Sequence, residues 1–355
     1  MAKLTKLLGG TALAVLGATT ASAGGMEVGR FDPGFLYETG NYAEVSYSSR
    51  SPDVTDSLYA PNSSMLSDFT TLNGALKLQL TDKIAVGLTS YDAGRIALDY
   101  SETGGPAPTN ASVTMRSTAI VAKYDVTDAI DVYGGIKMTT AEAEAFFLHP
   151  DDLPGTISAD SGNATGGLVG VSYSRSDIAL RVALTYQEAI ETTHTTTYNG
   201  GPFVDSVTGT PEMLTLDFQT GIAQGTLLFG SISNAKWFES QVYVAGQQLS
   251  TFTDSTSYSL GVGRKLNDNW SISGSVNYEA ATGDDSTTLL DTTDGNQGVS
   301  LGVRYTRDNM TVSVGANYSK FGDKTYVGDT PSPLDNGVFA DNSIMTYGMK
   351  VGFSF

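Results

Sequence analysis

The sequence contains no cysteine and only two histidines in 355 residues. The lack of cysteine excludes a disulfide framework and thiol chemistry, so the stability of the chain must come from its fold. His149 and His194 lie 45 positions apart, and we expect both in long connections. This spacing excludes a His-Glu-x-x-His zinc motif, and the positions do not favour a Ser–His hydrolase. We therefore expect no enzymatic activity, no metal and no cofactor.

Basic residues are scarce, and long hydrophobic runs are absent. The chain has 20 Lys and Arg against 38 Asp and Glu, a net charge of −18. This balance argues against binding to nucleic acid or to anionic lipid. After the first 23 residues no apolar run approaches the 18 or so residues of a membrane-spanning helix. If the mature protein is in a membrane, it must cross it as a barrel.

The N-terminus has the three parts of a secretory signal peptide. Lys3 and Lys6 form the basic region, residues 7–18 the apolar region, and residues 21–23 (Ala-Ser-Ala) a cleavage site. We expect residues 1–23 to be removed on export. The remaining chain carries 18 basic and 38 acidic residues, a net charge of about −20.

What the chain does contain is typical of β-structure, with 40 Gly, 18 Tyr and many Thr and Ser. Alternation of apolar and polar residues recurs along the chain, and no linker divides it. We therefore expect one barrel domain, residues 41–355. The predicted strands are 41–50, 72–81, 83–100, 112–124, 129–139, 166–174, 178–188, 213–222, 226–237, 256–265, 269–279, 298–306, 310–319 and 344–355.

The connections between these strands alternate strictly between short and long. An up-and-down barrel requires this when one end faces the periplasm and the other the outside, whereas a Greek-key sandwich does not. An even strand number also places both termini at the periplasmic end. The sequence thus predicts an all-β fold, a 14-stranded antiparallel transmembrane β-barrel in the bacterial outer membrane. The short turns are 81–83, 125–128, 175–177, 223–225, 266–268 and 307–309.

The last predicted strand, residues 344–355, shows the alternation clearly. One register carries Tyr347, Met349, Val351, Phe353 and Phe355, and the other carries mostly small or polar residues. A strand of a soluble sandwich has the same pattern. The terminal Phe nevertheless resembles the closing strand of outer-membrane barrels, in which the last aromatic lies in the interfacial girdle.

Several segments resemble the outer-membrane transporters of long-chain fatty acids and hydrophobic compounds, the FadL/TodX family of Gram-negative bacteria. Residues 35–47 (FLYETGNYAEVSY) are similar to the entry into their first strand. Residues 210–212 (TPE), followed by 234–237 (NAKW), are similar to their central segment. Fourteen strands is also the number of this family. The resemblance implies a monomeric channel with a hydrophobic small-molecule ligand.

The same resemblance implies an N-terminal plug, but this chain departs from the family pattern there. It has no Asn-Pro-Ala segment, and only residues 24–40 precede the first strand. We expect these residues to fold inward as a short plug that bends at the turn signal Asp32-Pro33-Gly34, next to the apolar Phe31. The alternative is a disordered periplasmic tail.

Two sets of residues are candidates for ligand contact. Phe146, Phe147 and Leu148, in an expected helix-favouring loop after the fifth strand, and Phe203 in the next long loop would form an apolar capture groove. The alternative is a local core under the loop. For a carboxylate head group, alternation places six cations in the lumen, where pairing with Glu44, Asp131 or Asp217 is the alternative. They are Arg50, Lys77, Lys137, Arg181, Arg304 and Lys350.

The third predicted strand has an interruption at residues 91–95 (YDAGR). Glycine within a strand often marks a bulge. The family resemblance implies a kinked third strand with a lateral exit here, at Tyr91, Asp92 and Gly94. The alternative is an ordinary bulge where the strand leaves the lipid.

Together these features predict an outer-membrane transporter for passive uptake of hydrophobic compounds, above all long-chain fatty acids. Substrate would be captured at the outer loops and released sideways through the wall. Two alternatives remain. One is a water-filled diffusion porin for small polar solutes. The other is a structural or adhesive barrel that acts through its acidic loops.

Overall fold

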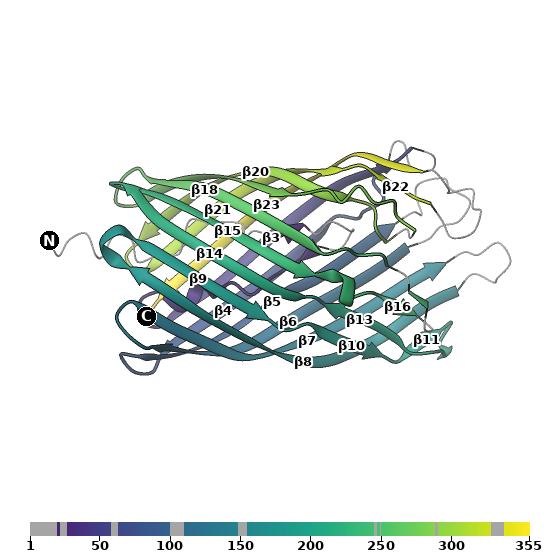
Figure 1. Ribbon diagram of the computed structural model, residues 1–355, viewed down its shortest axis with the longest axis horizontal. Coiled ribbons are helices and arrows are strands. Elements are labelled where there is room, and N and C mark those ends of the chain that lie inside the picture. The colour runs from purple at the N-terminus through teal and green to yellow at the C-terminus, as the bar shows by residue number, and fades with distance from the viewer. Residues whose placement is uncertain are drawn as a thin grey trace.

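The computed structural model describes residues 20–21, 27–57, 63–99, 110–147, 155–244, 247–248, 250–287, 290–327 and 337–355. Fourteen long antiparallel strands form its wall (Figure 1). The prediction of a 14-stranded antiparallel barrel is therefore confirmed. The wall strands are β3 (Tyr42–Asp56), β4 (Phe69–Gln79), β5 (Ile84–Asp99), β6 (Asn110–Asp125), β7 (Ile130–Phe147), β8 (Gly155–Arg175), β9 (Leu180–Gln187), β14 (Glu212–Ala223), β15 (Thr226–Lys236), β18 (Ser255–Lys265), β19 (Trp270–Glu279), β20 (Asp294–Arg307), β21 (Met310–Gly322) and β23 (Val338–Ser354).

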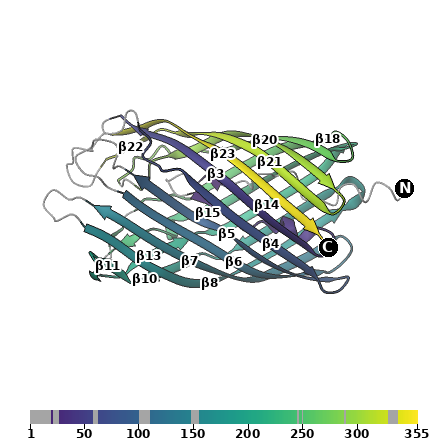
Figure 2. The same cartoon turned by 180° about the vertical axis from the view of Figure 1, so that it is seen from behind.

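The barrel closes where the last strand meets the first. β23 pairs with β21 on one side and with β3 on the other, with Gly352 opposite Glu44 (Figure 2). Beyond the strand, the backbone N–H of Phe355 donates to the carbonyl of Asn41 at 3.0 Å. Both ladders of β23 are thus occupied, and the sheet has no free edge at this seam.

The outer surface of the barrel is an apolar belt. Side chains such as Ile136 (66% exposed) and Leu301 (72% exposed) point outward, and their strand neighbours point into the lumen. Phe353 and Phe355 stack with ring centroids 6.4 Å apart near the end of β23. A belt of this kind is stable only in contact with lipid. The described residues include no helix that is long and apolar enough to cross a membrane.

The two ends of the barrel differ. The short turns and the C-terminus share one end, at the left in Figure 1, and the described parts of the long connections, such as residues 190–210 and 324–327, lie toward the other. The turn between β14 and β15 depends on Gly225, whose φ of +67° favours glycine. The remaining elements are β1 (Thr20–Ala21), β2 (Glu27–Val28), η1 (Pro33–Tyr37), η2 (Ser176–Ile178), β10 (Ile190–His194), β11 (Thr196–Tyr198), β12 (Gly201–Pro202), β13 (Ser206–Thr210), η3 (Trp237–Glu239), β16 (Tyr243–Val244), β17 (Gln247–Gln248) and β22 (Lys324–Thr325).

Residues 141–147 are not a helix-favouring loop, so this expectation was wrong. They continue β7, which pairs with β6 through Asn110 and Phe146 and with β8 through Phe146 and Thr156. The segment Ala-Glu-Ala-Glu-Ala has a period of two, and two neighbouring strands satisfy its backbone. Pairing on both sides therefore outweighs the helix propensity of Ala and Glu.

Candidate functional site

The lumen contains a chamber with a volume of about 290 Å³. One wall of this chamber, formed by β15 and β18 to β21, carries hydroxyl and amide side chains. Ser231 and Ser259 hydrogen-bond at 2.8 Å, and Asn317 donates to Ser300 at 2.9 Å and to Asn277 at 3.2 Å. These groups satisfy one another across neighbouring strands, so this wall is polar without being charged.

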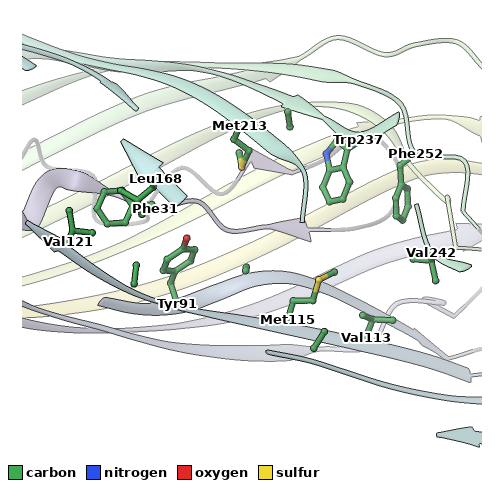
Figure 3. Close-up of a cluster of buried hydrophobic side chains, with 14 of the residues drawn as sticks. Phe31, Tyr91, Val113, Met115, Val121, Leu168, Met213, Trp237, Val242 and Phe252 are labelled. Atoms are coloured by element: carbon green, nitrogen blue, oxygen red, sulfur yellow. The ribbon is translucent and has the colours of Figure 1, made fainter. Parts of the chain in front are cut away.

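Apolar side chains also lie inside the barrel, and they come from the N-terminal segment, from β5 and β6, from β14 and from the end of β15. Figure 3 shows Phe31 at one end, Tyr91, Met115 and Met213 in the middle, and Trp237 toward the other end. All five side chains are buried. The lumen therefore presents both apolar and polar side chains.

The connection between β15 and β18 buries Trp237 and Phe252 at the outer end. The rings of Trp237 and Phe252 meet edge to face with centroids 5.3 Å apart. The Gln241 side chain holds them together, because its Nε2 donates to the Trp237 carbonyl at 3.0 Å and to the Phe252 carbonyl at 2.7 Å. Sequence reasoning missed Phe252 and Gln241, since neither belongs to an alternating segment.

Residues 29–38 lie against the inner face of the wall. The Arg30 guanidinium forms two hydrogen bonds with the Asp217 carboxylate on β14, at 2.8 and 3.0 Å. The Phe31 backbone N–H donates to Oε1 of Gln187 on β9 at 3.4 Å, and the Phe31 side chain is fully buried. The contacts thus extend over strands from different parts of the barrel.

Within this segment, η1 begins where the sequence has its turn signal. The Asp32 carboxylate accepts from the Gly34 backbone N–H at 2.8 Å and caps the helix, which starts at Pro33. Phe35 packs where β5 has Gly87, because a Cβ at Gly87 would lie 2.6 Å from Cε2 of Phe35. Strand β5 therefore makes room for this segment.

All six predicted cations occupy lumen-facing positions. Three of them, Arg50, Arg181 and Lys350, line the chamber, whereas Lys77, Lys137 and Arg304 do not. Lys350 forms an ion pair with Glu44 at 3.4 Å. Burial by itself would raise the pKa of the Asp32 carboxyl, but the charges of Lys350 and Arg30 hold that pKa below its usual value. Cations and carboxylates thus line the chamber together.

The wall is interrupted between β4 and β5. Their ladder runs from Gln79 opposite Ala85 to Gly74 opposite Ser90. Beyond this point no β4–β5 backbone pairing joins residues 69–73 to residues 91–96, all of which the structure describes. Pairing resumes further out, where the Ser67 N–H donates to the Ala97 carbonyl at 3.0 Å. We call this unpaired stretch the β4–β5 gap.

The predicted exit residues lie at this gap. A bulge between Asp92 and Gly94 shifts the register of β5 against β6, and the Tyr91 hydroxyl donates to Gln187 at 3.2 Å inside the lumen. Inside the gap, Glu27 of β2 pairs with Arg95. Sequence reasoning did not find Phe69 or Arg116 here, because only the register between strands brings them to the interruption at residues 91–95.

The predicted capture residues are not gathered into one groove in the described residues. Phe146 is half-buried in β7, and Phe203 is 41% exposed with its ring 5.8 Å from that of Tyr198. Strand β8 lies between them, since it pairs with both β7 and β11. Phe147 ends β7, but its side chain lies outside the described residues, as does Leu148.

Within the described part of the chain, no group of three His, Asp or Glu side chains could hold a metal ion. His194 is buried in β10 and contacts the Thr208 hydroxyl at 2.8 Å. In the acidic stretch from residue 291 to residue 294, Asp291 pairs with Lys324 at 3.2 Å and the Asp294 carboxylate accepts from the Gly283 backbone N–H at 2.7 Å. These side chains have structural partners.

Comparison with known proteins supports the fold through structure alone. No protein-family model and no curated protein matches the sequence. A FadL homologue from Pseudomonas aeruginosa matches with a TM-score of 0.71 at 12% identity, over 97% of this chain and 98% of that one. The toluene transporters TodX of Pseudomonas putida and TbuX of Ralstonia pickettii match with TM-scores of 0.65 and 0.66 at 13% identity, over 96% and 99% of this chain and 98% and 97% of theirs. The chain therefore has the fold of the FadL-type outer-membrane transporters.

Proposed function

We propose that this protein is an outer-membrane channel for the passive uptake of hydrophobic compounds, and that its substrates are long-chain fatty acids. The mixed lumen supports this assignment, because an acyl chain can lie along its apolar side chains. Arg50, Arg181 and Lys350 then face the chamber in which a carboxylate would lie. The FadL homologue and the toluene transporters share this fold.

The observation that carries the proposal is the β4–β5 gap. A porin conducts along its axis and has no use for an interruption in its wall. A compound that partitions into lipid can leave sideways, and Tyr91, Asp92 and Gly94 would frame its exit. Release into the bilayer spares the acyl chain a passage through water.

The N-terminal residues would form the plug. Arg30, Phe31 and Phe35 contact or pack against β14, β9 and β5. A segment anchored to three separate strands would block axial flow and direct the substrate to the gap. Capture at the outer end is assigned to Phe146, Phe147, Leu148 and Phe203. Phe146 lies on β7 and Phe203 follows β12, and β8 pairs with both β7 and β11.

The polar wall favours a second candidate, a diffusion porin. Rows of Ser and Asn side chains such as Ser231, Ser259 and Asn317 suit a water-filled path. The two functions differ in what crosses the barrel and where it leaves.

Two measurements separate them. In a Gram-negative host that lacks its own fatty-acid channel, expression should raise uptake of labelled oleate above that of cells with the empty vector. In liposomes, the purified protein should not admit sugars. Gly87→Val, which would displace Phe35, should raise sugar entry, whereas Gly274→Ala, where a Cβ makes only ordinary contact at 3.6 Å, should not. Sugar entry through the unaltered protein without oleate uptake would identify a porin.

A further inference from the structure

Within the β4–β5 gap, the facing edges of β4 and β5 form no backbone ladder with each other, although both strands belong to the membrane-spanning wall. Unpaired backbone groups in lipid cost several kcal/mol each, so other groups must satisfy them. Two side chains do so here. Oδ1 of Asn73 accepts from the Asp92 backbone N–H at 3.0 Å, and Nη2 of Arg116 donates to the Leu72 carbonyl at 2.6 Å. Side chains thus replace part of the ladder at the gap.

Arg116 comes from β6, not from either edge of the gap. It lies in the outward register of β6, which it shares with Thr118 and Ile120. Its Nε also donates to the Ser90 hydroxyl at 3.0 Å and its Nη1 to Oδ1 of Asp92 at 3.2 Å. One guanidinium therefore joins β6, β5 and β4 on the outer face of the wall.

Further guanidinium groups meet at the same place. Nη2 of Arg95 donates to Oδ2 of Asp92 at 3.4 Å, so the two oxygens of this carboxylate bind two arginines. The Phe69 ring lies between Arg95 and Arg50, whose guanidinium carbons are 5.2 and 5.5 Å from its centroid. A chain with a net charge of −18 thus concentrates positive charge at the opening in its wall.

An arginine facing lipid is unfavourable by about 2–4 kcal/mol near the membrane midplane. Arg116 is 39% exposed on its side chain and is held by hydrogen bonds to two other strands, β5 and β4. The Asp92 carboxylate offers Arg116 and Arg95 the same ligand as the head group of a fatty acid. Arg116 binds Asp92 through Nη1 alone, whereas an arginine can bind a free carboxylate through two donors at once.

We propose that Arg116, which bonds the Leu72 carbonyl of β4 and the Asp92 carboxylate of β5, is a latch across the β4–β5 gap. The carboxylate of an anionic amphiphile opens the latch by replacing Asp92 and Leu72 as the partners of the Arg116 guanidinium. This inference rests on the proposed function and specifies which amphiphiles can leave through the gap. A neutral compound has no group to exchange with Asp92, so the latch stays closed to it. The gap therefore selects anionic over neutral amphiphiles of equal chain length.

The test compares uptake of oleate with uptake of oleyl alcohol, its neutral counterpart, in the host described above. The unaltered protein should favour oleate. Arg116→Leu removes both the latch and the exchange partner, and should lower the oleate-to-alcohol ratio about tenfold, since hydrogen bonds to a charged group contribute ~1.5–3 kcal/mol. Arg264→Leu is the matched control. Arg264 also lies in an outward register and bonds Thr226 of the next strand, but in an intact ladder.

Arg116→Lys keeps the charge but not the three directed donors. It should also lower the oleate-to-alcohol uptake ratio, and it replaces Arg116→Leu in the test if that variant does not fold. An unchanged ratio in the folded variants, with oleate uptake intact, would overturn the latch and leave the proposed function standing. Failure of the unaltered protein to take up either compound would overturn the function itself. A similar loss with Arg264→Leu would show a general effect of removing arginine and would also overturn the latch.

Discussion

Charged residues inside the barrel and its outer loops are held by partners contributed from distant parts of the chain. Arg30 with Asp217 and Lys324 with Asp291 are examples, and the latter pair is almost fully buried, with both side chains 2% exposed. A buried pair adds little by itself, because desolvation offsets the attraction. Removal of one partner of such a pair is costly, because the remaining charge stays buried without an opposite charge.

We predict that Lys324→Met destabilises the outer loops by about 3–5 kcal/mol at neutral pH. Burial raises the pKa of the Asp291 carboxyl, and Lys324 opposes this shift. Without Lys324 the pKa should rise further. The folded state then binds more protons than the unfolded state, so its stability falls as pH rises above the ordinary value for Asp.

The measurement is proteolysis of the loop before β20 at pH 4 and pH 7. Lys324→Met should be cleaved much faster than the unaltered protein at pH 7 and only slightly faster at pH 4. Lys320→Met, at an exposed position on β21, serves as the control and should behave as the unaltered protein. If Lys324→Met were cleaved equally fast at both pH values, the Asp291 carboxyl would not be the group whose charge destabilises the variant.

At the scale of the strand, neighbouring residues face different solvents. On β20, Leu301 is 72% exposed on the lipid side, and Ser300 lines the chamber. The same alternation explains why residues 141–147 form a strand. Their Ala and Glu residues alternate, and β6 and β8 pair with them on both sides.

We predict that Leu301→Arg destabilises the barrel by about 2–4 kcal/mol, because the charge would enter the middle of the lipid-facing set of β20. Ser300→Arg introduces the same side chain one position away but into the polar lumen, so it should cost much less. Urea unfolding in lipid vesicles, followed by tryptophan fluorescence, measures the difference. Equal destabilisation by both substitutions would contradict the assignment of Leu301 to the lipid side and Ser300 to the lumen side of β20.

For the whole molecule, closure is the decisive feature. β23 supplies backbone partners to β21 and to β3 together, so its removal would expose two strand edges to lipid. The N-terminal segment and the chamber both depend on this closed wall, because their contacts come from strands on different sides of it.

Deletion of residues 344–355 should therefore abolish the folded barrel. Refolding in detergent, followed by the heat-dependent shift in gel mobility that intact barrels show, is the measurement. Deletion of Phe355 alone removes the single hydrogen bond to Asn41 but no residue of β23, and should leave the shift intact. A normal shift in the larger deletion would show that β3 and β21 can close without β23.

Much of this architecture was predictable from the sequence. Alternation with a period of two, strictly alternating short and long connections and the apolar C-terminal strand predicted fourteen strands in a barrel. Each of these signals is local, since it depends only on which residues face lipid and which face the lumen. The six lumen cations followed from the same rule, because facing is a property of a residue and its immediate neighbours.

The tertiary structure alone decided which of these groups meet. Arg116 and Leu72 lie 44 positions apart, and only the register of three adjacent strands brings the guanidinium to that carbonyl. The inward path of residues 29–38 likewise depends on the space at Gly87 and on the charge of Asp217. The physical reason is that facing repeats within each strand, whereas register and the absence of pairing are properties of two strands together.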